Sequence, residues 1–253
     1  MKINPLLFCL LFLLINSYNI HSQSREIIVK TTNKLIIIDG FEGEEAWENA
    51  NEISDFRQWF PTDSLKAEYP TTVKIIRDQE NIFILIKSFT KNKDYVVPSL
   101  RRDFEGMAVD NVTFVFDTFN DRTNGYFFGT NPAGTKREAL LSNGANDYRR
   151  DSNKSWDIKW DTESQIYDGY ILNEIKIPLK FLNFPEGSKS WGFNLYRFDT
   201  NANEWTTWIP RTRNQMIVSL AFLGNMIFED PLGKSKAPLA IIPFINGITS
   251  KNF

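Results

Sequence analysis

The sequence has 253 residues, 42% of them hydrophobic and 14% aromatic, and a formal net charge of −2 at pH 7. A charge so close to balance gives no electrostatic support for binding to nucleic acid or to an anionic membrane surface. Only one cysteine, Cys9, and one histidine, His21, are present, and both lie near the N-terminus. The rest of the chain therefore has no side chains for a disulfide, a Ser-His-Asp triad or a Cys/His zinc site.

The first 22 residues have the layout of a secretory signal peptide. A basic start at Lys2 precedes an apolar run over 6–15, which is too short to span a bilayer as a helix. We expect cleavage after Ser22, which leaves Gln23 first. Phe8 stands before Cys9 where a lipoprotein signal needs a small residue, so a lipid anchor is not expected. The chain is predicted to reach the periplasm, the outer membrane or the cell surface.

Beyond the signal peptide the dominant hydrophobic period is two. A short helix is predicted in "EGEEAWENA" (42–50), with Trp47 as its core anchor, and strands are predicted over 71–77, 82–89 and 109–118. The stretch "DTFNDRTNGYFFGTNPAGTKREA" (117–139) does not fit an EF-hand loop, because Phe119 or Arg122 falls where an acid is needed. Asn124-Gly125 predicts a hairpin between strands 112–118 and 126–131 instead.

Further along, "SWDIKWD" (155–161) alternates strictly and predicts a strand with Trp156, Ile158 and Trp160 on one face. Strands are also expected over 168–178 and 190–200, with a turn after Pro178 and a weaker strand over 216–224. Many short strands separated by Gly, Pro and Asn predict an all-β fold, an antiparallel β-sandwich with one or two short helices, over residues 23–228. Residues 229–253 are expected to form a linker and the start of a further, barrel-like region.

The tryptophans divide into two groups. Burial is expected for Trp156, Trp160 and Trp191, which lie on strand faces. Trp205 and Trp208 flank a polar stretch in "NEWTTWIPRTR". Exposed rings there could stack on the C–H face of a sugar, whereas buried rings would mark a strand end packed under a loop. The pattern leaves both interpretations open.

The order of the segments resembles a known family. "IIIDGFEGEEAW", "DFRQWFPTD", "TTVKIIRDQENIFILI", "DNVTFVFDTF", "GYILNEIKIPLKFL", "WGFNLYRF" and "WTTWIPR" together are similar to the family 9 carbohydrate-binding-module-like domain over about residues 35–225. More specifically, the segments resemble the form at the front of large bacterial outer-membrane proteins of unknown function with a barrel-like C-terminal region. The resemblance implies a jelly-roll sandwich, carbohydrate binding and, in some members, structural calcium.

Sugar-binding members clamp a terminal sugar between two Trp rings. By the resemblance, Trp208 matches one ring, while Met107 stands where the other belongs. The contacting Glu falls at Thr113 and the contacting Arg near Phe128. Asp110, Asp117 and Asn131 match the family pattern.

We therefore expect a non-catalytic domain that binds an oligo- or polysaccharide, without a nucleic-acid partner. The predicted ligand residues are Trp208, Trp205, Asn131, Arg197, Arg211 and Arg102. Asp110 and Asp117 are predicted to hold a structural calcium ion or to form a loop-fixing ion pair. One alternative is an interaction domain of an outer-membrane barrel protein without sugar affinity. Another, part of a glycoside hydrolase in carbohydrate catabolism, has no specific support, because 31 acids make a facing pair uninformative.

Overall fold

The computed structural model describes residues 25–91 and 95–236, which form strands with a few short helical pieces. The strands are β1 (Glu26–Thr31), β2 (Glu52–Ile53), β3 (Arg57–Phe60), β4 (Thr71–Arg77), β5 (Asn81–Phe89), β6 (Asn111–Asp117), β7 (Gly125–Thr130), β8 (Lys136–Leu141), β9 (Ser152–Asn153), β10 (Asp161–Tyr167), β11 (Tyr170–Pro178), β12 (Ser190–Asp199), β13 (Glu204–Thr207) and β14 (Gly224–Phe228). The helical pieces are α2 (Glu45–Glu48), α3 (Tyr148–Asp151) and three 3-10 turns, η1 (Gly106–Ala108), η2 (Asn143–Ala145) and η3 (Leu179–Phe181). The predicted all-β class is confirmed.

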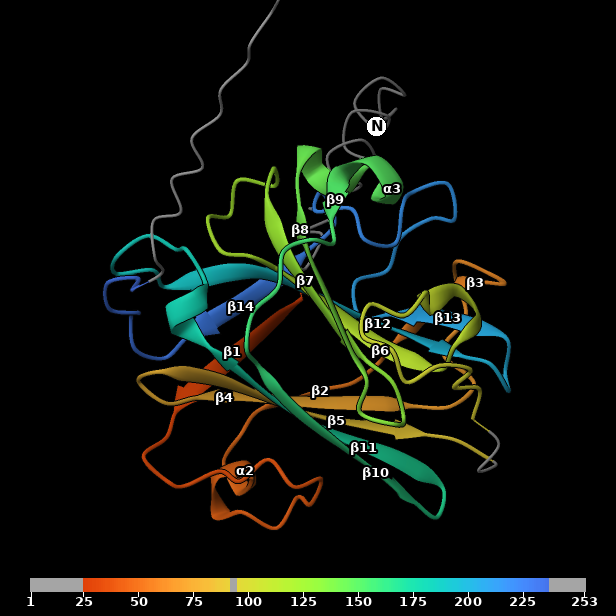
Figure 1. Cartoon of the computed structure of the whole chain (residues 1–253), viewed down its shortest axis with the longest axis horizontal. Helices are drawn as coiled ribbons and strands as arrows, with labels where there is room; N and C mark the ends of the chain where they lie inside the picture. The colour runs from red at the N-terminus through yellow and green to blue at the C-terminus, as the bar shows by residue number, and fades with distance from the viewer. Residues whose placement is uncertain (1–24, 92–94, 237–253) are drawn as a thin grey trace, which may run out of the picture.

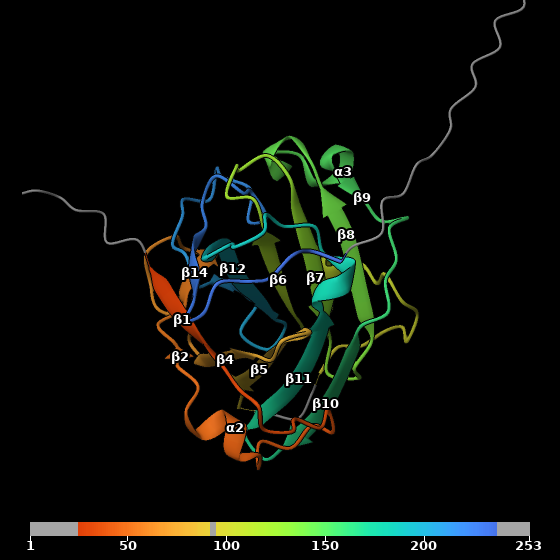
Figure 2. The same cartoon turned by 90° about the vertical axis from the view of Figure 1, so that its left-hand side faces the viewer.

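Two layers of strands face each other (Figures 1 and 2). One layer has the order β10-β11-β5-β4, and the other has the order β14-β12-β6-β7-β8-β9, with β13 and β3 beside β12. β1 joins the layers, pairing in parallel with β14 over Glu26–Val29 and with β4 over Lys30–Thr31. The predicted sandwich is confirmed, and these two parallel pairings add to an otherwise antiparallel arrangement.

The main core fills the space between the layers with aromatic and β-branched side chains, which gain most from leaving water. Phe116 lies at its centre, in ring contact with Phe114, Phe128, Trp191 and Phe193. A second cluster lies on the outer face of the β12–β6–β7–β8 layer, and a third lies under α2, where Trp47 is buried as predicted. No helix in the described residues is long and apolar enough to cross a bilayer.

The predicted hairpin is present. β6 and β7 pair from Val112↔Thr130 to Phe116↔Tyr126. The Asp117 carboxylate caps the turn between them, accepting hydrogen bonds from the backbone N–H groups of Phe119, Asp121 and Arg122 at 3.3, 3.3 and 2.8 Å. The short helix near Trp47 and the turn after Pro178 are also confirmed, as α2 and η3.

Residues 155–160 do not form the predicted strand. Ile158 and Trp160 are buried while Lys159 is exposed, so the alternation of burial is real. Within residues 25–91 and 95–236 the segment has no ladder partner, however, and side chains bind two of its carbonyls: Arg102 donates to the carbonyl of Ile158 at 2.9 Å and Lys136 to that of Trp160. An extended, half-buried segment without a neighbouring strand gives the same period of two as a strand.

The predicted strand over 216–224 is also wrong. Turns occupy residues 214–222, and regular pairing begins only at β14. The apolar residues Ile217, Val218 and Leu220 are buried in the second cluster, where they cover the outer face of the sheet. The apolar run therefore reflects a covering loop, not a strand.

Candidate functional site

An aromatic patch forms where β3 and β13 pair, and we define it as Trp59, Phe60 and Trp205. Trp205 is half-buried on β13, its ring stacked on Phe198 with centroids 4.7 Å apart and planes 24° apart. Trp59 of β3 stands edge-on to it at 6.5 Å and 80°. Trp205 is thus one predicted ligand residue that is partly exposed.

Polar groups border this patch. The indole N–H of Trp59 donates to the carbonyl of Gln215 at 2.9 Å, which ties the ring to the 212–215 turn. The exposed Arg213 guanidinium lies 5.1 Å from the centroid of Phe60 and donates to the carbonyl of Pro61 at 3.0 Å. Half-exposed rings beside planar polar groups are suited to a sugar, whose C–H face stacks and whose hydroxyls hydrogen-bond.

Trp208 is buried in this structure, with 3% of its surface exposed. Its ring packs on Phe193 in the main core at 5.7 Å, and the backbone N–H of Trp208 donates to the carbonyl of Leu195 at 2.9 Å. Trp208 therefore takes a core role instead of the predicted stacking role. It and Trp205 do not form a clamp, because they lie in different clusters on either side of one sheet.

Asn131 and Arg197 are buried as well. The Asn131 side-chain oxygen accepts from the N–H groups of Ala133 and Thr135, both at 3.0 Å, and so fixes the turn after β7. Arg197 pairs with Asp199 at 2.6 Å, and burial lowers the pKa of its guanidinium. Both residues line a cavity of about 10 Å³ together with Asp110. That space suits one water molecule and is far too small for a sugar.

Arg211 organises the loop that replaces the expected strand over 216–224. Its guanidinium donates to the carbonyls of Met216, Ile217 and Phe222 at 3.0, 2.8 and 2.6 Å. The side chain is 5% exposed, and this burial lowers its pKa to about 10. The predicted ligand contact is thus replaced by a loop-fixing role, since buried carbonyls need donors.

Arg102 remains partly exposed, with 39% of its side chain accessible. It pairs with the buried Glu138 and, at 2.5 Å, with the exposed Asp157. These contacts join the 95–110 segment to β8 and to the extended 155–160 segment. Arg102 does not lie with Trp205, so the structure does not gather the predicted ligand residues into one site.

A further arginine, which was not among the predicted site residues, lies under the turn η1. Arg137 of β8 has its guanidinium between the rings of Phe104 and Phe127, at 4.9 and 5.0 Å. It donates to the side-chain oxygens of Asn111 and Thr113. Gly106 lies so close that a Cβ there would overlap the guanidinium, so the turn covers this polar network. Nothing in the spacing along the chain relates Arg137 to Thr113; the pairing of β6, β7 and β8 brings them together.

Met107, at the position of the second clamp ring, is 76% exposed on the same turn. Phe128, at the position of the contacting Arg, is fully buried in the main core. The clamp of sugar-binding members is therefore not reproduced at these positions.

Asp110 and Asp117 do not form a shared calcium site. They flank β6 at opposite ends, about 20 Å apart at the rise of a strand. Asp110 accepts from the N–H groups of Val96 and Thr200 at 2.8 and 2.9 Å, as Asp117 does in its own turn. Each carboxylate fixes a loop by accepting hydrogen bonds from backbone N–H groups, and not through the predicted ion pair.

Carboxylates do converge elsewhere in the described residues, at Asp39, Glu44 and Glu174, whose oxygens lie within 4.8 Å of one another. Glu174 is fully buried and accepts from the N–H groups of Asp39 and Gly40, both at 3.0 Å, and from the Trp47 indole at 3.2 Å. Burial raises its pKa to about 7. Oxygen ligands of this kind suit calcium, and these three residues fit a cation better than Asp110 and Asp117 do.

Fold and surface together define a small β-sandwich with an aromatic patch at a sheet edge and no gathered set of acid–base groups among the predicted residues. The chain matches the model of the carbohydrate family 9 binding domain-like family over residues 38–230. It therefore belongs to that family.

Solved structures have the same fold. A family 9 carbohydrate-binding module from Caldicellulosiruptor kristjanssonii in complex with cellotriose aligns at a TM-score of 0.56 and 16% identity, over 88% of this chain and all of the module. The complex with glucose aligns at a TM-score of 0.55 and 16% identity, over 87% of this chain and all of the module. A protein from Bacteroides uniformis, described as a candidate carbohydrate-binding protein, aligns at a TM-score of 0.62 and 15% identity. The alignment covers 81% of this chain and all of that protein. No curated protein matches the sequence.

Proposed function

We propose that this chain is an exported, non-catalytic domain that binds carbohydrate. The family match over residues 38–230 carries the proposal. The structures of similar fold include two complexes of a family 9 module, one with cellotriose and one with glucose, which makes a neutral glucan the first ligand to test. Export rests on the signal-peptide layout of residues 1–22. N-terminal sequencing of the protein from a periplasmic or surface fraction tests it, with Gln23 expected first.

The aromatic patch supports the proposal best among the surfaces described. Trp59 and Trp205 are half-buried, held in place by the Gln215 carbonyl and by Phe198, and bordered by Arg213. A rigid ring loses little entropy on binding, so it can stack on a pyranose with most of the contact energy retained. The sugar in this proposal lies on the patch and not in the small cavity beside Asn131.

Isothermal titration calorimetry with cellotriose tests the function. We expect saturable heat in the range of weak glycan binding, a Kd of about 1 mM to 1 μM. The same titration with a panel of other neutral oligosaccharides identifies the preferred linkage. Absence of heat with every oligosaccharide in the panel, at millimolar concentrations, contradicts carbohydrate binding.

One observation favours a second candidate, an interaction domain. The segment after residue 94 exposes Val96, Leu100 and Met107 by 44%, 75% and 76%. Clustered exposed apolar side chains are typical of protein contact surfaces. A protein partner on this segment predicts that Leu100→Glu with Met107→Glu releases the domain from the outer-membrane fraction while leaving glycan binding unchanged. Unchanged fractionation of the double variant removes this candidate.

A further inference from the structure

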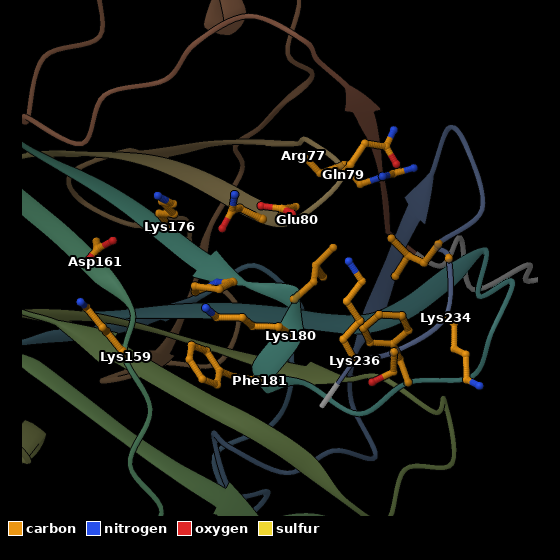
Figure 3. A pocket seen from close by; sticks show the side chains of 17 residues that line it. Arg77, Gln79, Glu80, Lys159, Asp161, Lys176, Lys180, Phe181, Lys234 and Lys236 are labelled. Atoms are coloured by element: carbon orange, nitrogen blue, oxygen red, sulfur yellow. The ribbon is translucent and has the colours of Figure 1, made fainter. Parts of the chain in front are cut away.

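A wide basic groove opens at the end of the sandwich where β5 starts and β11 ends. It has a volume of about 880 Å³. Its basic side chains come from four separate parts of the chain: Arg77, Lys159, Lys176, Lys180, Lys234 and Lys236. Figure 3 shows them spread along the groove, with Lys180 and Phe181 near its middle. β3 and β13, which carry the aromatic patch, lie on the other side of the molecule from β1 and β14 beside the groove (Figure 1).

The groove concentrates positive charge on a chain whose net charge is −2. Six basic side chains line it against two acidic ones, Glu80 and Asp161. Asp161 lies opposite Lys176 in the β10–β11 ladder. Within residues 25–91 and 95–236, none of the five lysines takes part in an ion pair shorter than 4.0 Å. Unpaired cations in one groove attract an anion and raise its local concentration.

Arg77 is a buried residue in the lining of the groove. It is 2% exposed, and it donates to the carbonyls of Asp78 and Asp230 at 3.1 and 2.8 Å. Its Nε is buried and has no hydrogen-bond partner in the described part of the chain. A buried guanidinium held by carbonyls keeps its positive charge without a contacting carboxylate.

Hydrogen bonds also fix the wall formed by residues 232–236. Leu232 is buried and exchanges backbone hydrogen bonds with Gly187 and Ser188, both at 2.9 Å. The Ser235 hydroxyl donates to the carbonyl of Leu182 at 2.8 Å. Lys234 and Lys236 therefore stand on an attached segment, and their positions belong to the folded domain.

The remaining lining is apolar and aromatic. Leu179 and Phe184 are buried beneath the groove, and Phe181 is half-buried with the Lys180 ammonium 5.1 Å from its ring centroid. A ring with a cation beside it offers both a stacking face and a charge. That pair suits a sugar that carries an acidic group.

We propose that the basic groove binds an extended acidic polysaccharide through its carboxylate or sulfate groups. Cations spread over several segments match repeated anions along a polymer better than a single small ion, and 880 Å³ lies within the usual range for ligand sites. The choice of a polysaccharide over another polyanion rests on the proposed function. The positive charge of the groove is independent of the proposed function, because it follows from the lining residues.

The test compares polygalacturonate with its fully methyl-esterified form, which has the same backbone without the charges. Binding is measured by calorimetry at low and at 0.5 M salt. The groove variant is Lys176→Gln/Lys180→Gln/Lys236→Gln. The control, Lys34→Gln/Lys66→Gln/Lys189→Gln, removes the same charge from exposed lysines outside the groove. We expect at least a tenfold loss of affinity for polygalacturonate in the groove variant, less than threefold in the control, and no binding of the ester.

Equal losses in the two variants would overturn the proposal, because they would indicate general charge attraction. If millimolar inorganic sulfate displaced polygalacturonate completely, the groove would be a site for a single oxyanion, and the polysaccharide proposal would be overturned. Binding to vesicles containing anionic phospholipid, without binding to polygalacturonate, would point to a membrane surface and also overturn it. Titration with cellotriose distinguishes failure of the groove proposal from failure of the proposed function. Binding of cellotriose without binding of polygalacturonate supports the proposed function and contradicts the groove proposal. The reverse result keeps the groove and removes the neutral-sugar site.

Discussion

The ring of Trp59 on β3 stands edge-on to the ring of Trp205 on β13, with centroids 6.5 Å apart and planes at 80°. The two residues are far apart in the sequence, and the pairing of β3 with β13 brings them together. Their contact makes the aromatic patch a feature of the tertiary structure. It gives the proposed sugar site two rings on adjacent strands.

Replacing either ring should weaken glycan binding. For Trp59→Ala and Trp205→Ala we expect at least about a tenfold loss of cellotriose affinity by calorimetry, because exposed aromatic contacts dominate small interfaces. Trp156→Ala is the matched control, since Trp156 is also half-buried but packs on Tyr126, away from the patch. An equal loss in all three variants would indicate a general loss of folding, and thermal melts of each variant distinguish the two cases.

Trp208→Ala should act on stability. Its ring fills part of the main core, so truncation leaves a cavity and should lower the free energy of unfolding by about 3–5 kcal/mol. Urea denaturation measures the change, and Trp208→Phe should recover most of it. A Trp208→Ala variant of normal stability that no longer binds sugar would show that the ring acts in the site.

Arg211→Met should loosen the loop over residues 214–222. Three or more carbonyls lose their donor, which we expect to cost about 3 kcal/mol and to speed amide exchange in that loop. Arg213→Met, two residues away on an exposed side chain, should change stability by less than about 0.5 kcal/mol. Unfolding and hydrogen exchange of the pair give the comparison. Similar stability in both variants would contradict the loop-fixing role.

The buried carboxyl of Glu174 should make stability depend on pH. Burial raises its pKa to about 7 in the folded protein from 4.5, so the folded state binds the proton more tightly. That stabilisation is complete below about pH 4.5 and is lost as pH rises through 7. Its contribution to the free energy of unfolding is at most about 3 kcal/mol. Asp151 does not contribute in this window, because its pKa is lowered to about 2 and its stabilisation is lost only in acid.

Urea denaturation at pH 5 and pH 8 measures this effect. Burial raises the pKa of Glu204 too, so the wild-type slope contains more than one group. The difference between wild type and Glu174→Gln isolates Glu174, and the variant should lose part of the decrease between pH 5 and pH 8. An identical pH dependence in both proteins would contradict the assignment. Calcium that binds to Asp39, Glu44 and Glu174 should reduce the wild-type decrease, because it favours the ionised carboxyl.

Strong local patterns predicted much of the fold. β4, β5, β6, β7, β11 and β12 follow from apolar alternation and the Asn124-Gly125 turn. The segments over 155–160 and 216–223 have similar patterns but no partner strand among the described residues, and side-chain donors such as Arg102 and Arg211 bind their carbonyls. Apolar alternation along the sequence indicates which side chains are buried, whereas a β-ladder also requires a neighbouring strand.

The site was harder to predict, because exposure is decided by tertiary packing. Trp205 and Trp208 are three residues apart, and in extended backbone an odd spacing places two side chains on opposite faces. This spacing is enough to exclude a clamp made by these two rings. Which of the two is buried depends on Phe193 and Phe198, which lie on opposite faces of β12. The partner ring, Trp59, is brought by β3 from a distant part of the sequence.

Whether the sugar binds at the aromatic patch is tested by following the indole N–H signals of the seven tryptophans by NMR while cellotriose is added. Single Trp→Phe variants assign the signals. We expect saturable shifts at Trp59 and Trp205, with the buried Trp47, Trp160 and Trp191 unchanged and Trp208 little affected. Shifts centred on Trp208, or no shift at any indole with millimolar cellotriose, would contradict binding at the aromatic patch.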